Sequence, residues 1–347
     1  MKTHVLATLS LLVGTTLVAQ SARLTVDNSS TLSGDDIYAD LATAHAAARD
    51  GDTILIYGSN LPYGNLTVAK RLVILGPGYL LAENPNTPIS GTAIMANLII
   101  DGGANNSTNP GVNGGGAGTE VRGLSLTQYS GSGVQVSAND VVVSGNEINS
   151  ISVSNNEVTS ITVIQNYLIS NFTYFGGHPG ITNLTFRNNI VNFNFSLPLN
   201  SGGSISHNLF LGQNFNVASF NGPIQSNIAT STNATGFTFT STGNQVRNNT
   251  AANGQFGSDN GNNTAAAADL FVGATGNSTD GQYQLKATAT AAKGTAHDGT
   301  DRGPFGGARP YILSGVPDLP VILYLELPAT TRPTIPLEVT VRAASGN

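Results

Sequence analysis

The chain contains no cysteine, and only 10% of its 347 residues are charged. Without thiols it can form no disulfide, no thiolate metal site and no lipid-modified cysteine anchor. Its stability must therefore come from side-chain packing and backbone hydrogen bonds.

Glycine and asparagine are abundant instead, with 41 Gly and 38 Asn. A chain so polar and so poor in large side chains would be disordered if its apolar residues were scattered. Here Val, Ile, Leu and Phe recur at regular intervals, which predicts a buried stripe.

The first residues have the pattern of an export signal. Lys2 supplies a positive start, Val5–Val18 is mostly apolar, and Ala19-Gln20-Ser21 is a small-x-small cleavage site. We expect residues 1–21 to be removed and the protein to be secreted or held at the cell surface, with no membrane insertion afterwards. The remaining chain has 20 acidic and 13 basic residues, a net charge of −7. This charge argues against nucleic acid and anionic lipid as partners.

One short phrase recurs through the middle of the chain: an apolar residue, two variable residues, an asparagine, one more residue, and an apolar or small residue. Its asparagines are Asn146, Asn166, Asn189, Asn208, Asn227 and Asn249. Their steps of 20, 23, 19, 19 and 22 residues indicate the coils of a solenoid. Asparagine tolerates the left-handed backbone of a tight bend, and its amide can bond to asparagines on neighbouring coils. We therefore predict a structural ladder at one corner of each coil.

The expected elements are mostly short strands. The one helix is expected over Ile37–Arg49, with Asp35 or Asp36 as its cap and Gly51 as its stop. Strands are expected at Thr53–Tyr57, Asn65–Val68, Leu72–Leu75, Ala96–Ile100, Val121–Leu126, Val134–Val136, Val141–Val143, Ile151–Val153, Ile161–Ile164, Leu184–Phe186, Ser204–Ile205, Phe237–Thr240 and Gln245–Val246. Gly102–Thr119 is too polar to be a coil and predicts a loop, whereas Asn253–Thr264 marks the fading of the solenoid. Pro310–Asn347 predicts a terminal strand pair, Val321–Leu325 and Leu337–Val341.

Both ends resemble a known group of proteins. The Ala-rich helix followed by GDTILI and YGNLTVAKRLVILGPG resembles the opening of bacterial, exported, right-handed parallel β-helix proteins of the pectin-lyase-like group. In these proteins the helix covers the first coil. Ala268–Gly307 resembles their closing segment, which seals the last coil, but departs from it at Thr288–Thr290 and at Arg302.

The predicted fold is all-β: a right-handed parallel β-helix of about ten coils over residues 22–309, with a short C-terminal β tail at 310–347. Residues 35–51 would form the N-terminal cap and residues 265–309 the C-terminal closure. We expect a monomer.

The resemblance implies cleavage of a polysaccharide, but the residues argue against it. Hydrolysis needs two carboxylates about 5–9.5 Å apart, and a uronate lyase needs a base, usually with acidic calcium ligands or basic partners. Between Gly123 and Val246 the only charged residues are Asp140, Glu147, Glu157 and Arg187. Glu147 and Glu157 are half a coil apart, and Glu147 is expected to stack beside Gln128 and Tyr167. We therefore predict no catalytic residue.

The best candidate site comprises Asp101, Glu120, Arg122 and Asp140, with Tyr174 as a further binding candidate. Glu120 and Asp140 are 20 residues apart, so we expect them to be neighbours along the axis, beneath the Gly102–Thr119 loop. This group could bind calcium or a sugar. The simpler interpretation, which we prefer, is a solvated coil edge with one Glu–Arg pair, no metal and no cofactor.

Two histidines are weaker candidates. His178 lies in a Phe-Gly-Gly-His-Pro loop that faintly resembles the Gly-His-Gly of polygalacturonases, without the carboxylate motifs of that family. Tyr174 and Phe175 beside it could stack on a sugar, although we expect at least one of them to pack inward. His207 precedes Asn208 and is expected to be a turn residue.

The preferred function is a non-catalytic exported β-solenoid whose surface binds carbohydrate or contributes to adhesion. The alternatives are a lyase or glycoside hydrolase acting on an acidic polysaccharide, and a purely structural spacer.

Overall fold

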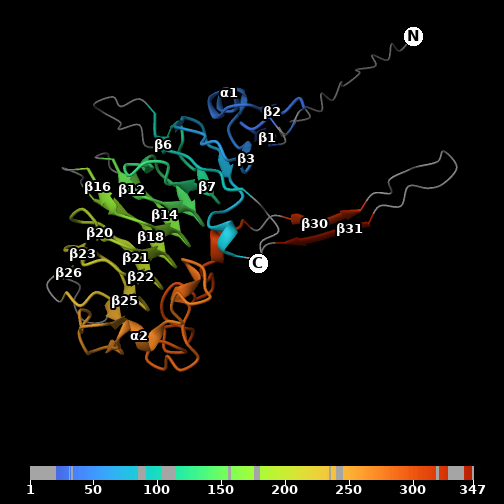
Figure 1. Cartoon of the computed structure of the whole chain (residues 1–347). Helices are drawn as coiled ribbons and strands as arrows, with labels where there is room; N and C mark the ends of the chain where they lie inside the picture. The colour runs from blue at the N-terminus through green and yellow to red at the C-terminus, as the bar shows by residue number, and fades with distance from the viewer. Residues whose placement is uncertain are drawn as a thin grey trace, which may run out of the picture.

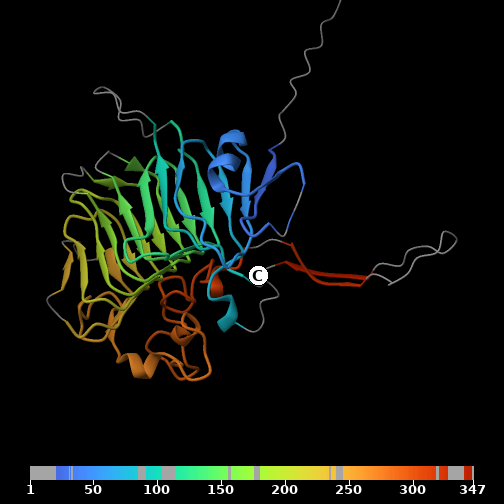
Figure 2. The same ribbon diagram turned by 45° about the horizontal axis from the view of Figure 1, so that its top comes forward.

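The computed structural model describes residues 21–345 apart from 31, 33, 85–90, 104–113, 155–157, 176–179, 234–235, 240–244, 318–319 and 327–339. Parallel sheets dominate it (Figures 1 and 2), which confirms the all-β parallel β-helix. Residues 1–20 of the expected signal segment lie outside the described residues. No helix in the described part has the length and apolar content needed to cross a bilayer.

Three sheets form the sides of the solenoid, and we name them A, B and C. Sheet A contains β1 (Arg23–Val26), β2 (Ile37–Tyr38), β3 (Thr53–Ile56), β5 (Val73–Leu75), β7 (Glu120–Arg122), β10 (Val142–Ser144), β14 (Thr162–Ile164), β18 (Leu184–Arg187), β21 (Gly203–Ser206), β24 (Ile224–Gln225) and β27 (Val246–Arg247). Sheet B contains β4 (Leu66–Val68), β6 (Asn97–Asp101), β9 (Gly133–Ser137), β12 (Ser150–Val153), β16 (Phe172–Tyr174), β20 (Asn194–Ser196), β23 (Asn214–Val217) and β26 (Phe237–Phe239). Sheet C contains β8 (Ser125–Leu126), β11 (Glu147–Ile148), β15 (Tyr167–Leu168), β19 (Ile190–Val191), β22 (Leu209–Phe210), β25 (Ile228–Ala229), β28 (Thr250–Ala251) and β29 (Asn263–Thr264). A small extra sheet joins β13 (Val158–Thr159) to β17 (Ile181–Thr182).

Each central coil runs through sheet A, then C, then B, so the solenoid has three faces. Sheet C was missed because its strands are two residues long, too short to show an alternation of apolar and polar residues. The expected strand Val121–Leu126 is in fact β7 and β8, which lie on different sheets. They are separated by a bend at Gly123, whose φ of +69° favours glycine.

The six asparagines of the repeat line the corner between sheets A and C. Each is fully buried, and the Nδ2 of each donates to the Oδ1 of the next at 3.0–3.1 Å. The ladder continues to Asn262, only 13 residues beyond Asn249. The solenoid therefore includes one further stacked asparagine within Asn253–Thr264, the segment where the sequence predicted that it fades.

The left-handed backbone of this corner lies one residue earlier than expected. It occurs at Gly145, Gln165, Asn188, His207, Ser226 and Asn248, with φ between +52° and +60°. The following asparagine is then free to turn its amide inward, where its Oδ1 accepts the backbone N–H of the neighbouring coil's asparagine, as in Asn146 N–H to Asn166 at 3.0 Å.

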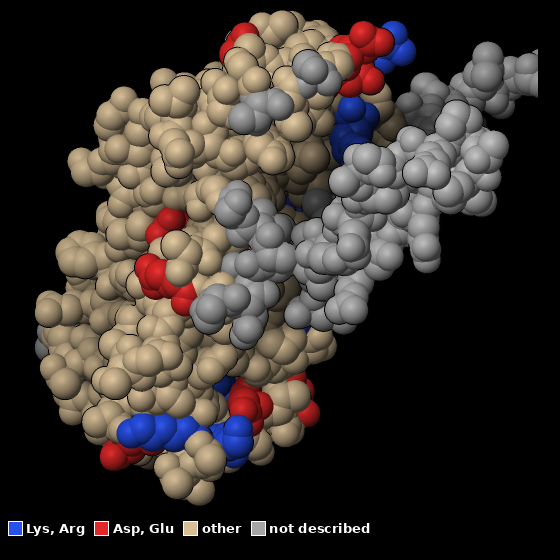
Figure 3. All heavy atoms as spheres, turned by 45° about the vertical axis from the view of Figure 1, so that its right-hand side comes forward, with Lys and Arg blue, Asp and Glu red and all other residues tan. Residues whose placement is uncertain are grey.

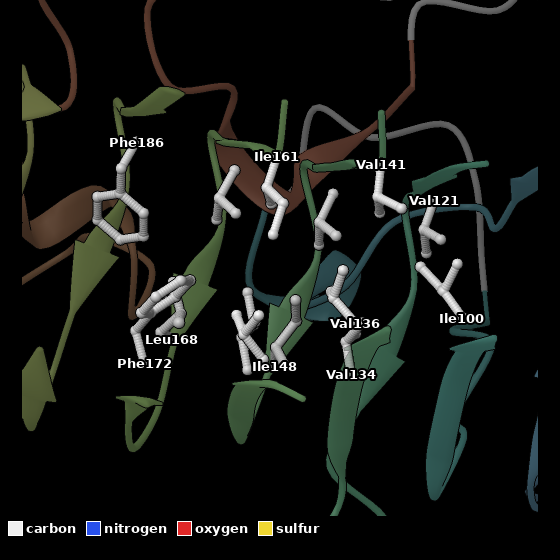
Figure 4. Close-up of a cluster of buried hydrophobic side chains, with 14 of the residues drawn as sticks. Ile100, Val121, Val134, Val136, Val141, Ile148, Ile161, Leu168, Phe172 and Phe186 are labelled. Atoms are coloured by element: carbon white, nitrogen blue, oxygen red, sulfur yellow. The ribbon is translucent and has the colours of Figure 1, made fainter. Parts of the chain in front are cut away.

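The core lies between the three sheets and consists of stacked apolar side chains (Figure 4). On sheet A, Val121, Val143, Val163 and Phe186 occupy equivalent positions on successive strands. Further along, Phe195 lies 4.5 Å from Phe186 between ring centroids and 5.2–5.4 Å from the next phenyl rings. This packing stabilises coils that have no covalent cross-link.

The N-terminal cap differs in detail from the expectation. The helix α1 spans Leu41–Ala47, and Asp40, rather than Asp35 or Asp36, caps it by accepting the Thr43 N–H at 2.8 Å. Ile37 and Tyr38 form β2 beside β1, in keeping with the preference of such side chains for strands. The helix ends at Ala47, and the backbone of the next residue, Ala48, is extended, so Gly51 is not its stop.

The closing segment, residues 265–316, runs back along the outside of sheet C (Figure 2). It contains α2 (Ala267–Leu270) and the 3-10 turns η3 (Gly281–Tyr283) and η4 (Leu313–Gly315), and it reaches Tyr79 beside η1 (Leu81–Glu83). The resemblance implied a seal on the last coil alone. The segment extends further because the outer side chains of sheet C are apolar, and Tyr167, Ile190, Leu209 and Ile228 are buried beneath it.

The C-terminal tail forms the expected strand pair, β30 (Pro320–Glu326) and β31 (Thr340–Ser345), which are antiparallel. The second strand is described from Thr340, so the expected start at Leu337 lies outside the described residues. The hairpin extends away from the coils in Figures 1 and 2.

Candidate functional site

The predicted acidic group is spread over two sheets. Glu120 and Arg122 lie on β7 of sheet A, where they form an ion pair. Asp140 lies in the turn before β10, and the residue paired with Glu120 is Val142, so the expected axial pairing of Glu120 with Asp140 is wrong. The coil is two residues longer there than the 20-residue step assumed.

The remaining predicted site residues lie on sheet B. Asp101 ends β6, and its carboxylate accepts the Gly103 N–H at 3.1 Å. Tyr174 ends β16 and packs against the core. Its neighbour Phe175 is 48% exposed, so one of the two aromatic residues points inward and the other outward.

Uncharged side chains form a continuous row along the outer face of sheet B. One side chain per strand contributes, and the register aligns neighbouring members. The row runs Thr67, Ile99, Gln135, Ser152, Thr173, Ser196, Asn216 and Thr238. Adjacent strands are roughly 4.8 Å apart, so the row presents a hydroxyl or amide at nearly every such step.

Two shallow hollows of about 500 Å³ each follow this row, and we call them together the sheet B groove. The first is lined by β4, β6, β9 and β12 with Phe175 at its edge, and the second by β16, β20, β23 and β26. They adjoin where Ser152 pairs with Thr173. The described lining contains no Asp, Glu, His, Lys or Arg. Figure 3 shows that charge is also sparse on another face of the molecule, where it gathers in a few small groups.

Hydrogen bonds between neighbouring strands hold several groove side chains in place. Asn97 Nδ2 donates to Asn65 Oδ1 at 3.1 Å, and Asn214 Nδ2 donates to Asn194 Oδ1 at 2.9 Å. Such bonds orient the remaining donors and acceptors before a ligand arrives, which lowers the entropy lost on binding.

A second polar cluster lies under the closing segment. Asp280 is fully buried, and its carboxylate accepts the Ser314 N–H at 2.7 Å and the Tyr311 hydroxyl at 3.2 Å. The Tyr311 hydroxyl also bonds to that of Tyr79. Burial raises the pKa of both tyrosines well above the usual value, so they stay protonated and can donate. This cluster therefore anchors the closing segment.

Glu147 lies at the margin of the same cluster. It is paired with Tyr167, as expected, but its other neighbour is Ser125 rather than Gln128. Burial is the main cause that raises the pKa of Glu147, while the Ser125 hydroxyl, which donates to it at 2.7 Å, acts in the opposite direction. No hydrogen bond among the described residues joins it to a second carboxyl, as an acid pair would require. Glu157 lies outside the described residues.

One group of described side chains could hold a metal ion, and the sequence reading missed it. His207, His297 and Asp298 bring their ligand atoms within 4.8 Å of one another. Burial is the main cause that lowers the pKa of each histidine, so both are neutral at pH 7. His207 does occupy a turn, as expected. Its partners lie about 90 residues away in sequence, where no repeat signal points to them. His178 lies outside the described residues.

No protein-family model, curated protein or solved structure matches the chain. The resemblance to the pectin-lyase-like group therefore stays an expectation from the two end motifs, and the geometry alone carries the functional argument.

Proposed function

We propose that this protein is a non-catalytic, exported β-solenoid that binds a neutral polysaccharide along the sheet B groove. The observation that carries the proposal is the continuous uncharged row from Thr67 to Thr238. Hydroxyl and amide groups can both donate and accept, which suits the hydroxyls of a sugar.

The shape of the groove favours an extended chain over a small molecule. The hollows are shallow and follow the solenoid axis across eight strands, whereas small-molecule sites enclose most of their ligand. Individually weak contacts along such a chain add up to useful avidity. Phe175 offers an aromatic face at the edge, where a sugar ring could stack.

Electrostatics favours a neutral ligand. An acidic polysaccharide would call for Lys or Arg in the groove, and the described lining contains neither. Among the described residues, the lining also offers no carboxylate pair for hydrolysis and no imidazole or amine as a base. Both observations support binding without cleavage.

Affinity electrophoresis through gels containing mannan, β-glucan, xyloglucan or polygalacturonate tests the proposal. We expect at least one neutral polymer to retard the protein and polygalacturonate to have no effect. Thr173→Lys, at the junction of the two hollows, should abolish the retardation. Thr185→Lys is the matched control, because Thr185 is an equally half-buried strand residue on sheet A.

Three outcomes would overturn the proposal. Equal retardation of Thr173→Lys and Thr185→Lys would mean that the polysaccharide binds outside the sheet B groove. Release of reducing ends or unsaturated products would favour a hydrolase or lyase. Absence of binding to every polymer and to a broad glycan array would favour a structural spacer.

A further inference from the structure

His207 lies at a rigid point of the coil. It occupies the left-handed corner position before Asn208, with φ of +54°, and Asn208 is held in the asparagine ladder on both sides. Its side chain is only 5% exposed. Its Nε2 faces the closing segment, 3.4 Å from Thr300 Oγ1 and 3.6 Å from Asp298 Oδ1.

His297 and Asp298 approach from the closing segment. The rings of His297 and His207 are 5.4 Å apart between centroids. A tetrahedral ion with ligand bonds of about 2.0–2.2 Å needs ligand atoms roughly 3.3–3.6 Å apart. The Asp298–His207 separation already satisfies this requirement, and all three ligand atoms lie within 4.8 Å of one another.

Neighbouring side chains set the orientation of both partners. Gln225 Oε1 accepts from Arg247 Nε at 2.9 Å, so the Gln225 amide nitrogen faces and donates to His297 Nε2, also at 2.9 Å. His297 Nε2 is then the unprotonated nitrogen, and Nδ1 carries the proton toward Ser226 Oγ at 2.9 Å. A second hydrogen bond that fixes the tautomer in this way is typical of metal-bound histidine.

Asp298 is oriented as well. Its Oδ1 accepts the Thr300 hydroxyl at 2.6 Å and the Thr300 N–H at 3.1 Å. Thr300 Oγ1 in turn accepts the Gly307 N–H at 2.8 Å, which ties this turn to the rest of the closing segment.

We propose that His207, His297 and Asp298 bind a zinc ion, with water as the fourth ligand, and that the ion clamps the closing segment to the coil. Two imidazoles and one carboxylate are ligands that zinc accepts in tetrahedral sites. Binding replaces the hydrogen bond from Gln225 to His297 Nε2. Because the ligands come from two parts of the chain that are separate in the unfolded state, the ion stabilises the folded protein by mass action.

Isothermal titration calorimetry of the metal-stripped full chain with ZnCl₂, paired with thermal unfolding, tests the site. We expect one zinc ion per chain and a rise in Tm that EDTA reverses. His297→Ala and Asp298→Asn should each weaken binding more than about tenfold. Both residues are exposed, so these variants avoid the folding risk of His207→Ala. His45→Gln, on α1, is the control and should leave binding unchanged.

Cobalt substitution adds a readout of geometry. Co²⁺ in a tetrahedral site gives intense visible absorption, which we expect in the native chain and not in His297→Ala. The proposal fails if no zinc binds, if His297→Ala binds zinc as tightly as the native chain, or if bound cobalt shows only the weak spectrum of six-fold coordination. The first result would leave His207 and Asp298 in a polar contact at 3.6 Å without a metal ion.

Discussion

The side-chain nitrogen of Asn166 lies 3.1 Å from the side-chain oxygen of Asn189, on the next coil and 23 residues away. The Asn166 backbone N–H bonds to the same oxygen at 3.0 Å. One buried amide therefore satisfies two donors of its neighbour, and the pattern repeats along the whole corner. This relationship locks the register of coils that have no disulfide and few charges.

Asn166→Ala should destabilise the fold by about 1–3 kcal/mol, because it removes hydrogen bonds to buried backbone groups of adjacent coils. Among these are the Val143 carbonyl and the Asn146 N–H. Urea unfolding followed by circular dichroism measures the loss. Asn171→Ala is the control, since Asn171 lies on the half-buried edge of the groove and outside the ladder. Equal losses in the two variants would contradict a special role for the ladder.

Arg302→Met should loosen the last coils. The Arg302 side chain is 3% exposed and donates to the carbonyls of Asn249, Gly261 and Thr295 at 2.7–3.0 Å. Burial lowers its pKa to about 10, so it is still charged at pH 7. Removing the guanidinium takes away the donor of the Gly261 carbonyl and one of two donors from the carbonyls of Asn249 and Thr295, which keep the Asn263 N–H and the Asn248 amide. We expect a cost of about 1–3 kcal/mol.

Hydrogen exchange of residues 249–264 should then become faster in Arg302→Met than in the native chain. The exposed Arg309→Met is the matched control and should exchange like the native protein. Unchanged exchange in Arg302→Met would mean that apolar packing alone holds the segment.

Asp280→Ala should release the closing segment without unfolding the coils. The substitution removes the carboxylate that accepts three hydrogen bonds, from the Ser314 N–H and from the Tyr311 and Ser278 hydroxyls. Loss of a hydrogen bond to a carboxylate typically costs about 1.5–3 kcal/mol. Trypsin should cleave at Lys286 faster, while the β-sheet circular dichroism is retained. Asp269→Ala, at an exposed position of α2, serves as the comparison. Native-like cleavage of Asp280→Ala would show that the apolar contacts to sheet C suffice.

Glu147 should make stability fall as the pH rises. Burial raises the pKa of Glu147, and the nearby carboxylates of Glu83 and Asp280 raise it further. Because the folded-state pKa lies above the ordinary value of 4.5, the folded state binds more protons between the two values. The contribution of Glu147 is therefore complete below about pH 4.5 and is lost as the pH rises through the folded-state pKa.

Urea titrations at pH 4 and pH 7 measure this effect. The stability of Glu147→Gln relative to the native chain should increase between the two values. Ser125→Ala removes the hydrogen bond that favours the ionised form, so it should steepen the native decline. A stability difference between Glu147→Gln and the native chain that does not change with pH would refute the assignment.

Periodicity predicted the fold because each coil repeats the same local requirement. An apolar strand residue, a bend and an inward amide recur near every twentieth residue, so the Asn146–Asn249 ladder and most strands of sheets A and B follow from sequence spacing. Errors arose where spacing was read too literally. The pairing of Glu120 with Asp140 assumed a constant coil length, and the expected helix start at Ile37 ignored a competing strand.

The sequence by itself determined the solenoid, its asparagine corner and the scarcity of charge along its middle, since these depend on residues close to one another in the repeat. Only the tertiary structure decided which faces are open. In the folded chain, residues 265–316 cover the apolar outer face of sheet C, the sheet B groove stays exposed, and His207 lies beside His297. Such contacts join parts of the chain up to about 230 residues apart, as between Tyr79 and Tyr311. They depend on how complementary surfaces pack, and no local pattern encodes that pairing.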